Sequence, residues 1–305
     1  MYLAHFGLRE LPFNLTPDTS FFFSNADHQE ALNTLLVAVR NGEGFIKITG
    51  EVGTGKTLLC RQFLESVNQS APDGKIQYVT AYIPNPYLEP RTLLLALAEE
   101  IGIELDKDAN QYRLIKALTL ALIDYARNGK RVVLCLDEAQ ALPPESLEAV
   151  RLLSNLETGK RKLLQIVLFG QPELNQRLRQ DSARQLNQRI VFHYHLGPLR
   201  RDEMEHYVAH RLSVANFAGD ALFTRPAINQ LYAASGGVPR LVNIIAHKAL
   251  MLAYGEGRQQ IKSRHVRAAA KDTEAARKSS WRWWALAAAL LVIIAGAAMW
   301  WMNTQ

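Results

Sequence analysis

Positions 50–57 read GEVGTGKT and match the pattern GxxxxGK[ST], between an apolar strand pattern, FIKIT, and a helical pattern, LLCRQFLESV. Glycines at this spacing let the backbone curl, so that its N–H groups and the start of the next helix face a phosphate group. We expect Lys56 to neutralise the β- and γ-phosphate oxygens and Thr57 to ligate Mg²⁺. The predicted nucleotide-binding residues are Gly50, Glu51, Val52, Gly53, Thr54, Gly55, Lys56, Thr57 and Leu58.

An acidic motif lies further along the chain. Positions 132–138 read VVLCLDE, an apolar strand pattern that ends in two carboxylates. In P-loop ATPases the first such carboxylate holds Mg²⁺ and the second polarises the attacking water. Asp137 is therefore a predicted metal ligand together with Thr57, and Glu138 is the predicted catalytic base. Taken alone, the motif is also compatible with a surface strand end, but its pairing with the phosphate loop favours the catalytic interpretation.

Three further positions are predicted to act on the nucleotide. Gln171 follows the apolar run LLQIVLFG and is expected to contact the γ-phosphate or the water, with a plain turn glutamine as the alternative. Arg189, or its neighbour Arg184, lies before the last strand pattern, where an arginine finger reaches the nucleotide of the next subunit; a surface arginine is the alternative. Arg240 follows Gly-Gly-Val-Pro at a helix start, which points its side chain toward the nucleotide cleft.

These residues require an α/β scaffold to position them. Apolar runs rich in β-branched residues occur at 45–49, 76–83, 132–136, 164–169 and 190–195. Helical patterns with leucines at three- and four-residue spacing alternate with them, at 57–68, 92–101, 112–127 and 145–157. This alternation predicts a five-stranded parallel sheet with helices on both faces.

After about residue 198 the strand patterns stop. Residues 201–270 read as helices only, with breaks at 217–220, 236–237 and 255–257. We therefore predict four parts of the chain. They are an ATPase core at 1–198, a helical lid at 199–270, a basic juxtamembrane linker at 271–282 and a transmembrane helix at 283–302.

The positive charge of the chain is concentrated near its end. The formal net charge is +6, and residues 258–282 hold eight basic side chains against two acidic ones, so this segment alone carries +6. The first 257 residues therefore sum to zero. A neutral body lacks the broad positive surface of non-specific nucleic-acid binders, so no nucleic-acid partner is expected. Cys60 and Cys135 have neither a disulfide framework nor a metal-binding spacing.

Residues 283–302, WWALAAALLVIIAGAAMWWM, form an uncharged run with tryptophans at both ends. About 20 such residues span the ~30 Å hydrocarbon core, although a buried core helix is the alternative. Basic residues precede the run and no secretory signal opens the chain, which places the body inside. The sequence thus predicts a single-pass bacterial inner-membrane protein with a cytoplasmic body and membrane lipid among its partners.

Several segments resemble the ExeA/GspA family of AAA+ ATPases. They are HFGLRELPFNLTPDTSFFF, GEVGTGKTLLCR, VVLCLDEAQAL, FGQPEL, LNQRI and SGGVPRLVNIIAHKAL. The resemblance spans about residues 1–270 and is strongest to the branch that serves mannose-sensitive haemagglutinin (MSHA) type IV pilus biogenesis.

The resemblance implies a P-loop AAA+ fold and hydrolysis of ATP with Mg²⁺. It also implies ATP-dependent self-association into a homo-oligomer, and inner-membrane pilus or secretion assembly proteins as partners. Secretion members of the family continue into a peptidoglycan-binding domain, so cell-wall binding is not expected of this chain. A DNA-binding AAA+ regulator of transposition and a scaffold that barely turns over ATP are the alternatives.

Overall fold

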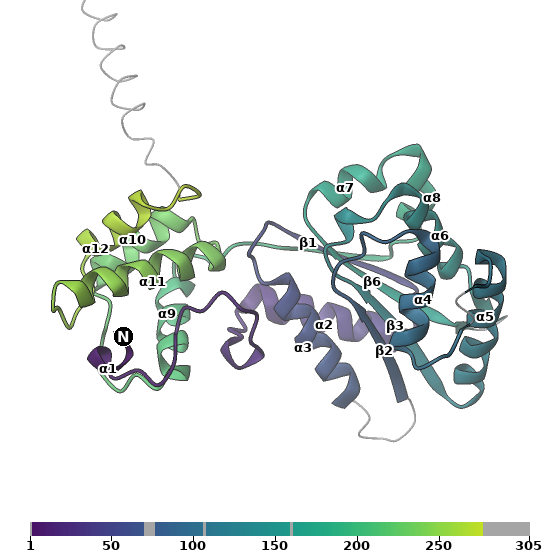
Figure 1. Cartoon of the computed structure of the whole chain (residues 1–305), viewed down its shortest axis with the longest axis horizontal. Coiled ribbons are helices and arrows are strands. Elements are labelled where there is room, and N and C mark those ends of the chain that lie inside the picture. The colour runs from purple at the N-terminus through teal and green to yellow at the C-terminus, as the bar shows by residue number, and fades with distance from the viewer. Residues whose placement is uncertain (1, 70–76, 106–107, 159–160, 277–305) are drawn as a thin grey trace, which may run out of the picture.

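The computed structural model describes residues 2–69, 77–105, 108–158 and 161–276. These residues form an α/β unit beside an all-helical unit (Figure 1). The helical unit comprises the elements after residue 198, which is the place where the sequence patterns lose their strands.

The α/β unit contains a parallel sheet with the strand order β2-β3-β6-β1-β7. Its strands are β1 (Phe45–Gly50), β2 (Gln77–Ile83), β3 (Lys130–Leu136), β6 (Leu164–Gly170) and β7 (Phe192–Leu196). The predicted five-stranded parallel sheet is therefore confirmed, and its strand bounds differ from the predicted ones by about two residues at most.

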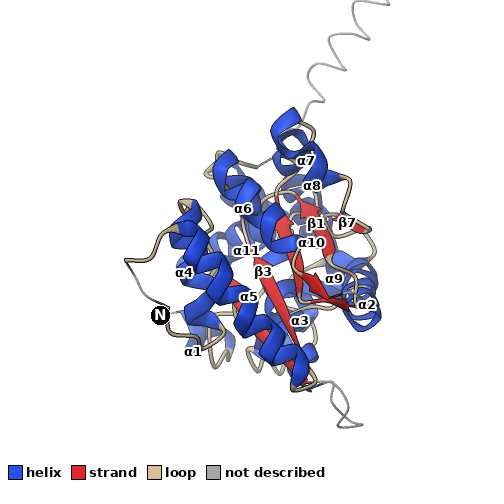
Figure 2. Cartoon of the chain, turned by 90° about the vertical axis from the view of Figure 1, so that its right-hand side faces the viewer, coloured by secondary structure: helices blue, strands red, loops and turns tan. Residues whose placement is uncertain are grey.

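Helices cover the sheet on both faces (Figure 2). One face packs against α2 (Ala26–Asn41) and α3 (Lys56–Gln69), and the other against α4 (Pro90–Glu100), α5 (Gln111–Arg127) and α6 (Pro144–Ser154). Successive residues of β3 serve the two faces in turn: Leu134 belongs to the core under α4 and α5, and Cys135 to the core under α3. A strand buried on both faces is apolar throughout, which is why these runs are readable in the sequence.

Short elements complete the α/β unit. The helical pattern predicted to run to residue 157 ends at Ser154 as α6, and a small antiparallel hairpin of β4 (Glu157–Thr158) and β5 (Arg161–Lys162) follows it. The helices α7 (Glu173–Leu178) and α8 (Arg184–Asn187) then connect β6 to β7. Such short helices leave no periodic pattern in the sequence.

The helical unit, called the lid below, contains α9 (Glu203–Val214), α10 (Arg225–Ser235), α11 (Pro239–Gly255) and α12 (Ser263–Lys271). Gly236, with φ at 62°, ends α10 in the left-handed conformation that a helix C-cap favours. The start of the chain joins this unit, because α1 (Tyr2–Phe6) and Phe13 belong to the apolar core of the lid. The division at residue 198 stays a prediction, and residues 2–21 pack on the lid side of it.

Helix length bears on the predicted membrane span. The longest described helices, α5 and α11, have 17 residues each, whereas a membrane crossing takes about 20 apolar ones. No helix among the described residues is long and apolar enough to cross a membrane. This finding corrects the predicted localisation as a single-pass inner-membrane protein with a cytoplasmic body. Residues 283–302, from which that localisation was predicted, lie outside the described residues, as do residues 277–282 of the predicted linker.

Candidate active site

The predicted phosphate loop joins the end of β1 to the start of α3. Gly53 and Gly55 have φ angles of 82° and 100°, in a region of backbone conformation that residues other than glycine rarely adopt. Both are also crowded: a Cβ on Gly53 would lie 2.4 Å from Cβ of Arg240, and one on Gly55 would lie 2.8 Å from Nε2 of His28. The two glycines are therefore required by backbone shape and by close neighbours together.

Lys56 is the first residue of α3 and is only 4% exposed. Its Nζ donates hydrogen bonds to the backbone oxygens of Gly50 at 2.8 Å and Glu51 at 2.9 Å. Burial lowers the pKa of its ammonium group, while the nearby carboxylates of Glu138 and Asp137 oppose that shift. The ammonium group is thus held against the loop, at the position from which it can meet phosphate oxygens.

Thr57 and Asp137 lie in direct contact where the loop meets the end of β3. Thr57 Oγ1 donates to Asp137 Oδ2 at 2.6 Å, and the hydroxyl of Tyr82 on β2 donates to the same oxygen at 3.3 Å. Asp137 is 2% exposed, and burial raises the pKa of its carboxyl group against these hydrogen bonds. A hydroxyl and a buried carboxylate side by side are the hard oxygen donors that Mg²⁺ prefers, so the two residues fit this cation.

Glu138 follows in a strained backbone conformation. Its φ is 51°, in the left-handed region that few residues other than glycine occupy. Its Oε2 accepts hydrogen bonds from Gln140 Nε2 at 2.5 Å and from Gln171 Nε2 at 3.0 Å. The backbone N–H of Gln171 donates in turn to Gln140 Oε1 at 2.9 Å. The structure thus brings Gln171, after β6, into contact with Glu138, after β3.

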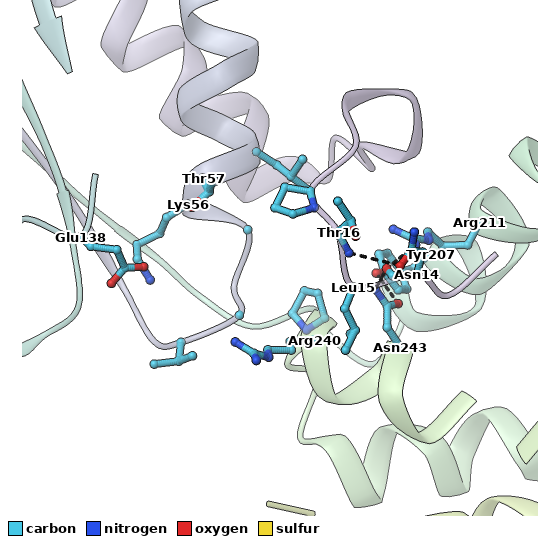
Figure 3. Close-up of a pocket in the computed structure, with 16 residues that line it drawn as sticks. Asn14, Leu15, Thr16, Lys56, Thr57, Glu138, Tyr207, Arg211, Arg240 and Asn243 are labelled. Atoms are coloured by element: carbon cyan, nitrogen blue, oxygen red, sulfur yellow. Dashed lines mark hydrogen bonds between the residues drawn. The ribbon is translucent and has the colours of Figure 1, made fainter. Parts of the chain in front are cut away.

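A pocket of about 350 Å³ lies between the phosphate loop and the lid. Lys56, Thr57 and Glu138 lie on one side of it, and Tyr207 and Asn243 of the lid lie on the other (Figure 3). The chain segment 14–17 closes the pocket between them. The pocket therefore has one end at the predicted phosphate loop and another made by the lid and the N-terminal segment.

The N-terminal segment is held in place by a buried arginine. Arg211 of α9 is 5% exposed and donates through Nε to the backbone oxygen of Pro12 at 2.5 Å and through Nη2 to that of Asn14 at 3.1 Å. Leu15, next to these anchored residues, is 51% exposed, and Val52 on the loop is 48% exposed. Both side chains line the pocket, where they offer apolar surface to a flat ligand group.

Arg240 connects the lid to the phosphate loop. It follows Pro239 at the first turn of α11, and its backbone N–H donates to the oxygen of Gly53 at 3.2 Å. Its side chain lines the pocket (Figure 3). The structure thus brings Arg240 to the cleft, where the sequence predicts it.

Arg189 and Arg184 lie away from this pocket. Arg189 Nη1 donates to the backbone oxygen of Ser154 at 3.4 Å and to its Oγ at 3.3 Å, beside the amino end of β1. Arg184 begins α8 with an exposed side chain. Neither arginine lines the pocket that holds Lys56 and Glu138 of its own chain.

The sequence of the chain is similar to those of known proteins. Residues 39–178 match the AAA domain family. The chain is a P-loop ATPase of the AAA+ class. Over 277 residues this ATPase is 43% identical to general secretion pathway protein A of Aeromonas hydrophila, and the similarity covers 91% of the chain and 49% of that relative. The chain therefore spans about half the length of this curated relative. The sequence identity supports the resemblance to the ExeA/GspA family.

Two groups of solved structures share the fold of the ATPase. The ORC2 protein of Aeropyrum pernix superposes with a TM-score of 0.64 at 17% identity, covering 88% of this chain and 74% of that one. RuvB of Thermotoga maritima superposes with a TM-score of 0.56 at 14% identity, covering 86% of this chain and 73% of that one. At such identities the similarity establishes the AAA+ fold alone.

Several residues at or beside the pocket are absent from the sequence-based prediction of the ATPase site. Tyr207 and Asn243 line the pocket from lid helices. Tyr82 on β2 hydrogen-bonds to Asp137, and Gln140 in a short 3-10 helix hydrogen-bonds to Glu138. None of them stands within a motif that specifies nucleotide chemistry. Asn14 and its neighbours belong to the opening segment that carries the family resemblance, and that segment is the one sequence feature that pointed to them.

Proposed function

We propose that this ATPase binds ATP with its phosphates at residues 50–58 and hydrolyses it with Glu138 as the base. Lys56 offsets the negative charge of the β- and γ-phosphates, and Mg²⁺, held by Thr57 and Asp137, would supply further compensation of that charge when bound. The carboxylate of Glu138 orients the attacking water and accepts its proton. The observation that supports this best is that Lys56, Thr57 and Glu138 line one pocket and that Asp137 is hydrogen-bonded to Thr57 at its edge.

We further propose roles for the residues around this centre. Gln171, which is hydrogen-bonded to Glu138, contacts the γ-phosphate or the attacking water. Arg240 contacts the phosphates from the lid. Arg189, rather than the exposed Arg184, completes the site of the next subunit in an ATP-dependent homo-oligomer. Its distance from its own pocket suits a group that acts on a neighbour.

In the cell, we propose, the ATPase assembles or remodels a type II secretion-like or type IV pilus complex. The sequence identity to a general secretion pathway protein, which extends over 91% of this chain, supports a role in such a complex. Within that class the MSHA pilus, served by the MshM type of ATPase, is the assignment favoured by the sequence resemblance. The partners would be envelope assembly proteins.

Complementation tests this proposal. A strain lacking the gene would be complemented with wild type, with Glu138→Gln, or with Glu145→Gln, which alters an exposed glutamate of α6 as a matched control. We expect surface pili or secreted substrates to return with wild type and Glu145→Gln and to remain absent with Glu138→Gln. Normal piliation and secretion in the deletion strain would refute the assembly function.

A further inference from the structure

A row of buried polar side chains connects the phosphate loop to the first helix of the lid. It runs from His28 on α2, through Asn25 at the N-cap of that helix, to Glu203 at the start of α9. These side chains belong to residues that are 5%, 5% and 9% exposed. Polar groups buried this deeply are normally hydrogen-bonded, so the row has a defined geometry.

His28 forms the end of the row that touches the loop. Its Nε2 occupies the space that a Cβ on Gly55 would need, at 2.8 Å. The ring of Phe22 packs edge-on against the imidazole, with 5.4 Å between the centroids. The imidazole therefore lies against Gly55, the residue that immediately precedes Lys56.

Asn25 determines how His28 is oriented. Its Oδ1 accepts hydrogen bonds from the backbone N–H of His28 at 2.9 Å and from the ring Nδ1 at 2.5 Å, and its Nδ2 donates to Glu203 Oε2 at 3.2 Å. A backbone N–H can only donate and a carboxylate can only accept, so the amide cannot be turned over without losing these bonds. The Asn25 amide is therefore fixed with its oxygen toward His28 and its nitrogen toward Glu203.

Glu203 attaches the row to the lid. Its Oε2 also accepts the backbone N–H of Arg200 at 2.8 Å, and its Oε1 pairs with the Arg200 guanidinium at 3.2 Å. Arg200 lies in the segment that leads from β7 into α9. A change in the angle of the lid would move Glu203 and thereby alter the hydrogen bonds that hold Asn25 and His28.

We propose that His28 is a positioning residue that couples the conformation of the phosphate loop to the position of the lid, through Asn25 and Glu203. The proposal rests on the ATP site described above. Neither His28 nor Glu203 lines the nucleotide pocket, so Glu203 influences ATP through the row and not by contact. The bond from the Arg240 N–H to the Gly53 oxygen is a second connection between loop and lid, so loss of the row weakens the coupling without removing it.

A double-mutant cycle on the full chain tests the coupling. Calorimetry would measure the Kd for MgATP in wild type, Glu203→Ala, His28→Ala and the double variant. We expect each single variant to raise Kd about 5-fold or more, the lower end of typical coupling between sites. In the His28→Ala background, Glu203→Ala should change Kd by less than about 2-fold, because the row is already broken. Effects that multiply, or an unchanged Kd in Glu203→Ala, would overturn the proposal.

Two variants separate the row from general effects on α9. Glu205→Ala removes an exposed glutamate from the same turn and should leave Kd unchanged. Glu203→Gln keeps an oxygen that can accept from Asn25, so it should recover most of the affinity that Glu203→Ala loses. Equal losses in Glu203→Gln and Glu203→Ala would assign the effect to charge and contradict the proposed row.

Folding and turnover are read separately. Thermal unfolding without nucleotide identifies variants that do not fold, and His28→Gln replaces His28→Ala in the cycle if the alanine variant is one of them. Steady-state kinetics should show a raised KM with kcat changed by less than about 2-fold, because the row leaves Glu138 and Asp137 in place. A fall in kcat alone would contradict a positioning role. If wild type itself bound no MgATP, the proposed ATP site would fail rather than the coupling.

Discussion

In the proposed site, the buried ammonium group of Lys56 is the group expected to hold phosphate at the loop. Its present partners are the backbone oxygens of Gly50 and Glu51, and phosphate oxygens offer stronger, charge-assisted hydrogen bonds. We expect Lys56→Ala to reduce affinity for MgATP below detection, because the loop would then face the phosphate charge with backbone dipoles alone. Isothermal titration measures this, with Lys116→Ala on the exposed face of α5 as the control. Wild-type affinity in Lys56→Ala would withdraw the assignment of the site.

Glu138 allows binding and chemistry to be separated. An amide preserves the shape of the side chain and its contacts with Gln140 and Gln171 but lacks a base. We therefore expect Glu138→Gln to retain MgATP with a Kd close to that of wild type and to release phosphate ~10²-fold more slowly or worse. A phosphate-release assay run beside calorimetry provides both numbers. Unchanged turnover would mean that another group activates the water.

The sequence predicts those parts of the site whose chemistry is carried by a contiguous motif. Lys56, Thr57, Asp137 and Glu138 stand in two short motifs. The structure places Lys56, Thr57 and Glu138 on one pocket, with Asp137 hydrogen-bonded to Thr57. Asn25 and Glu203 are 178 residues apart and form their hydrogen bond only because the lid packs beside α2. A pair of this kind has no spacing rule, so nothing in a single sequence indicates it.

Among the elements, the sheet can be predicted from sequence patterns, whereas the packing of the N-terminal segment cannot. Strands such as β3 and β6 are buried on both faces, so their composition alone marks them. The aromatic residues of the first 21 positions form no extended helical or strand pattern, because Tyr2 and Phe6 lie on the five-residue helix α1 and Phe13 lies on the irregular backbone that follows it. Sequence patterns therefore place only residues after 198 in the lid, whereas its apolar core also includes residues of the N-terminal segment.

The junction of α2 with the phosphate loop should also respond to pH. Burial lowers the pKa of His28 to about 4, and the Thr54 backbone contact and the charge of Glu203 only partly oppose that shift. The folded state therefore binds fewer protons here than the unfolded chain, whose histidine has its ordinary pKa of about 6.5. The stability contributed by neutral His28 is full above that pH and is lost as the pH falls toward about 4.

We expect this histidine to account for about 2 kcal/mol of the stability lost between pH 7.5 and pH 5. Urea unfolding at the two pH values measures the loss in wild type, and His28→Gln should show a smaller one by that amount. His206→Gln, an exposed histidine of α9, should behave as wild type. An equal pH dependence in wild type and His28→Gln would show that His28 is not buried as a neutral group.

At the scale of the whole molecule, the proposed role of Arg189 would make a complete catalytic site a property of two subunits. The guanidinium lies beside Ser154 near the amino end of β1, while Lys56 and Glu138 lie at the carboxyl ends of the strands. One chain therefore cannot supply both Arg189 and Glu138 to the same nucleotide without a large rearrangement. In a head-to-tail homo-oligomer, each site would take Glu138 from one subunit and Arg189 from the next.

This arrangement can be tested by mixing two inactive variants. We expect Arg189→Ala and Glu138→Gln each to hydrolyse ATP ~10²-fold more slowly than wild type or worse. When they are mixed in equal amounts and allowed to exchange, about a quarter of the sites pair an intact Glu138 with an intact Arg189 from the neighbour. Phosphate release should then recover to about a quarter of the wild-type rate, and it should fall on dilution as the oligomer dissociates. Arg184→Ala, which changes the exposed arginine of α8, should retain activity by itself. If the mixture stays as slow as its components while exchange is verified by fluorescence, Arg189 acts within its own chain or not at all, and the two-subunit site is refuted.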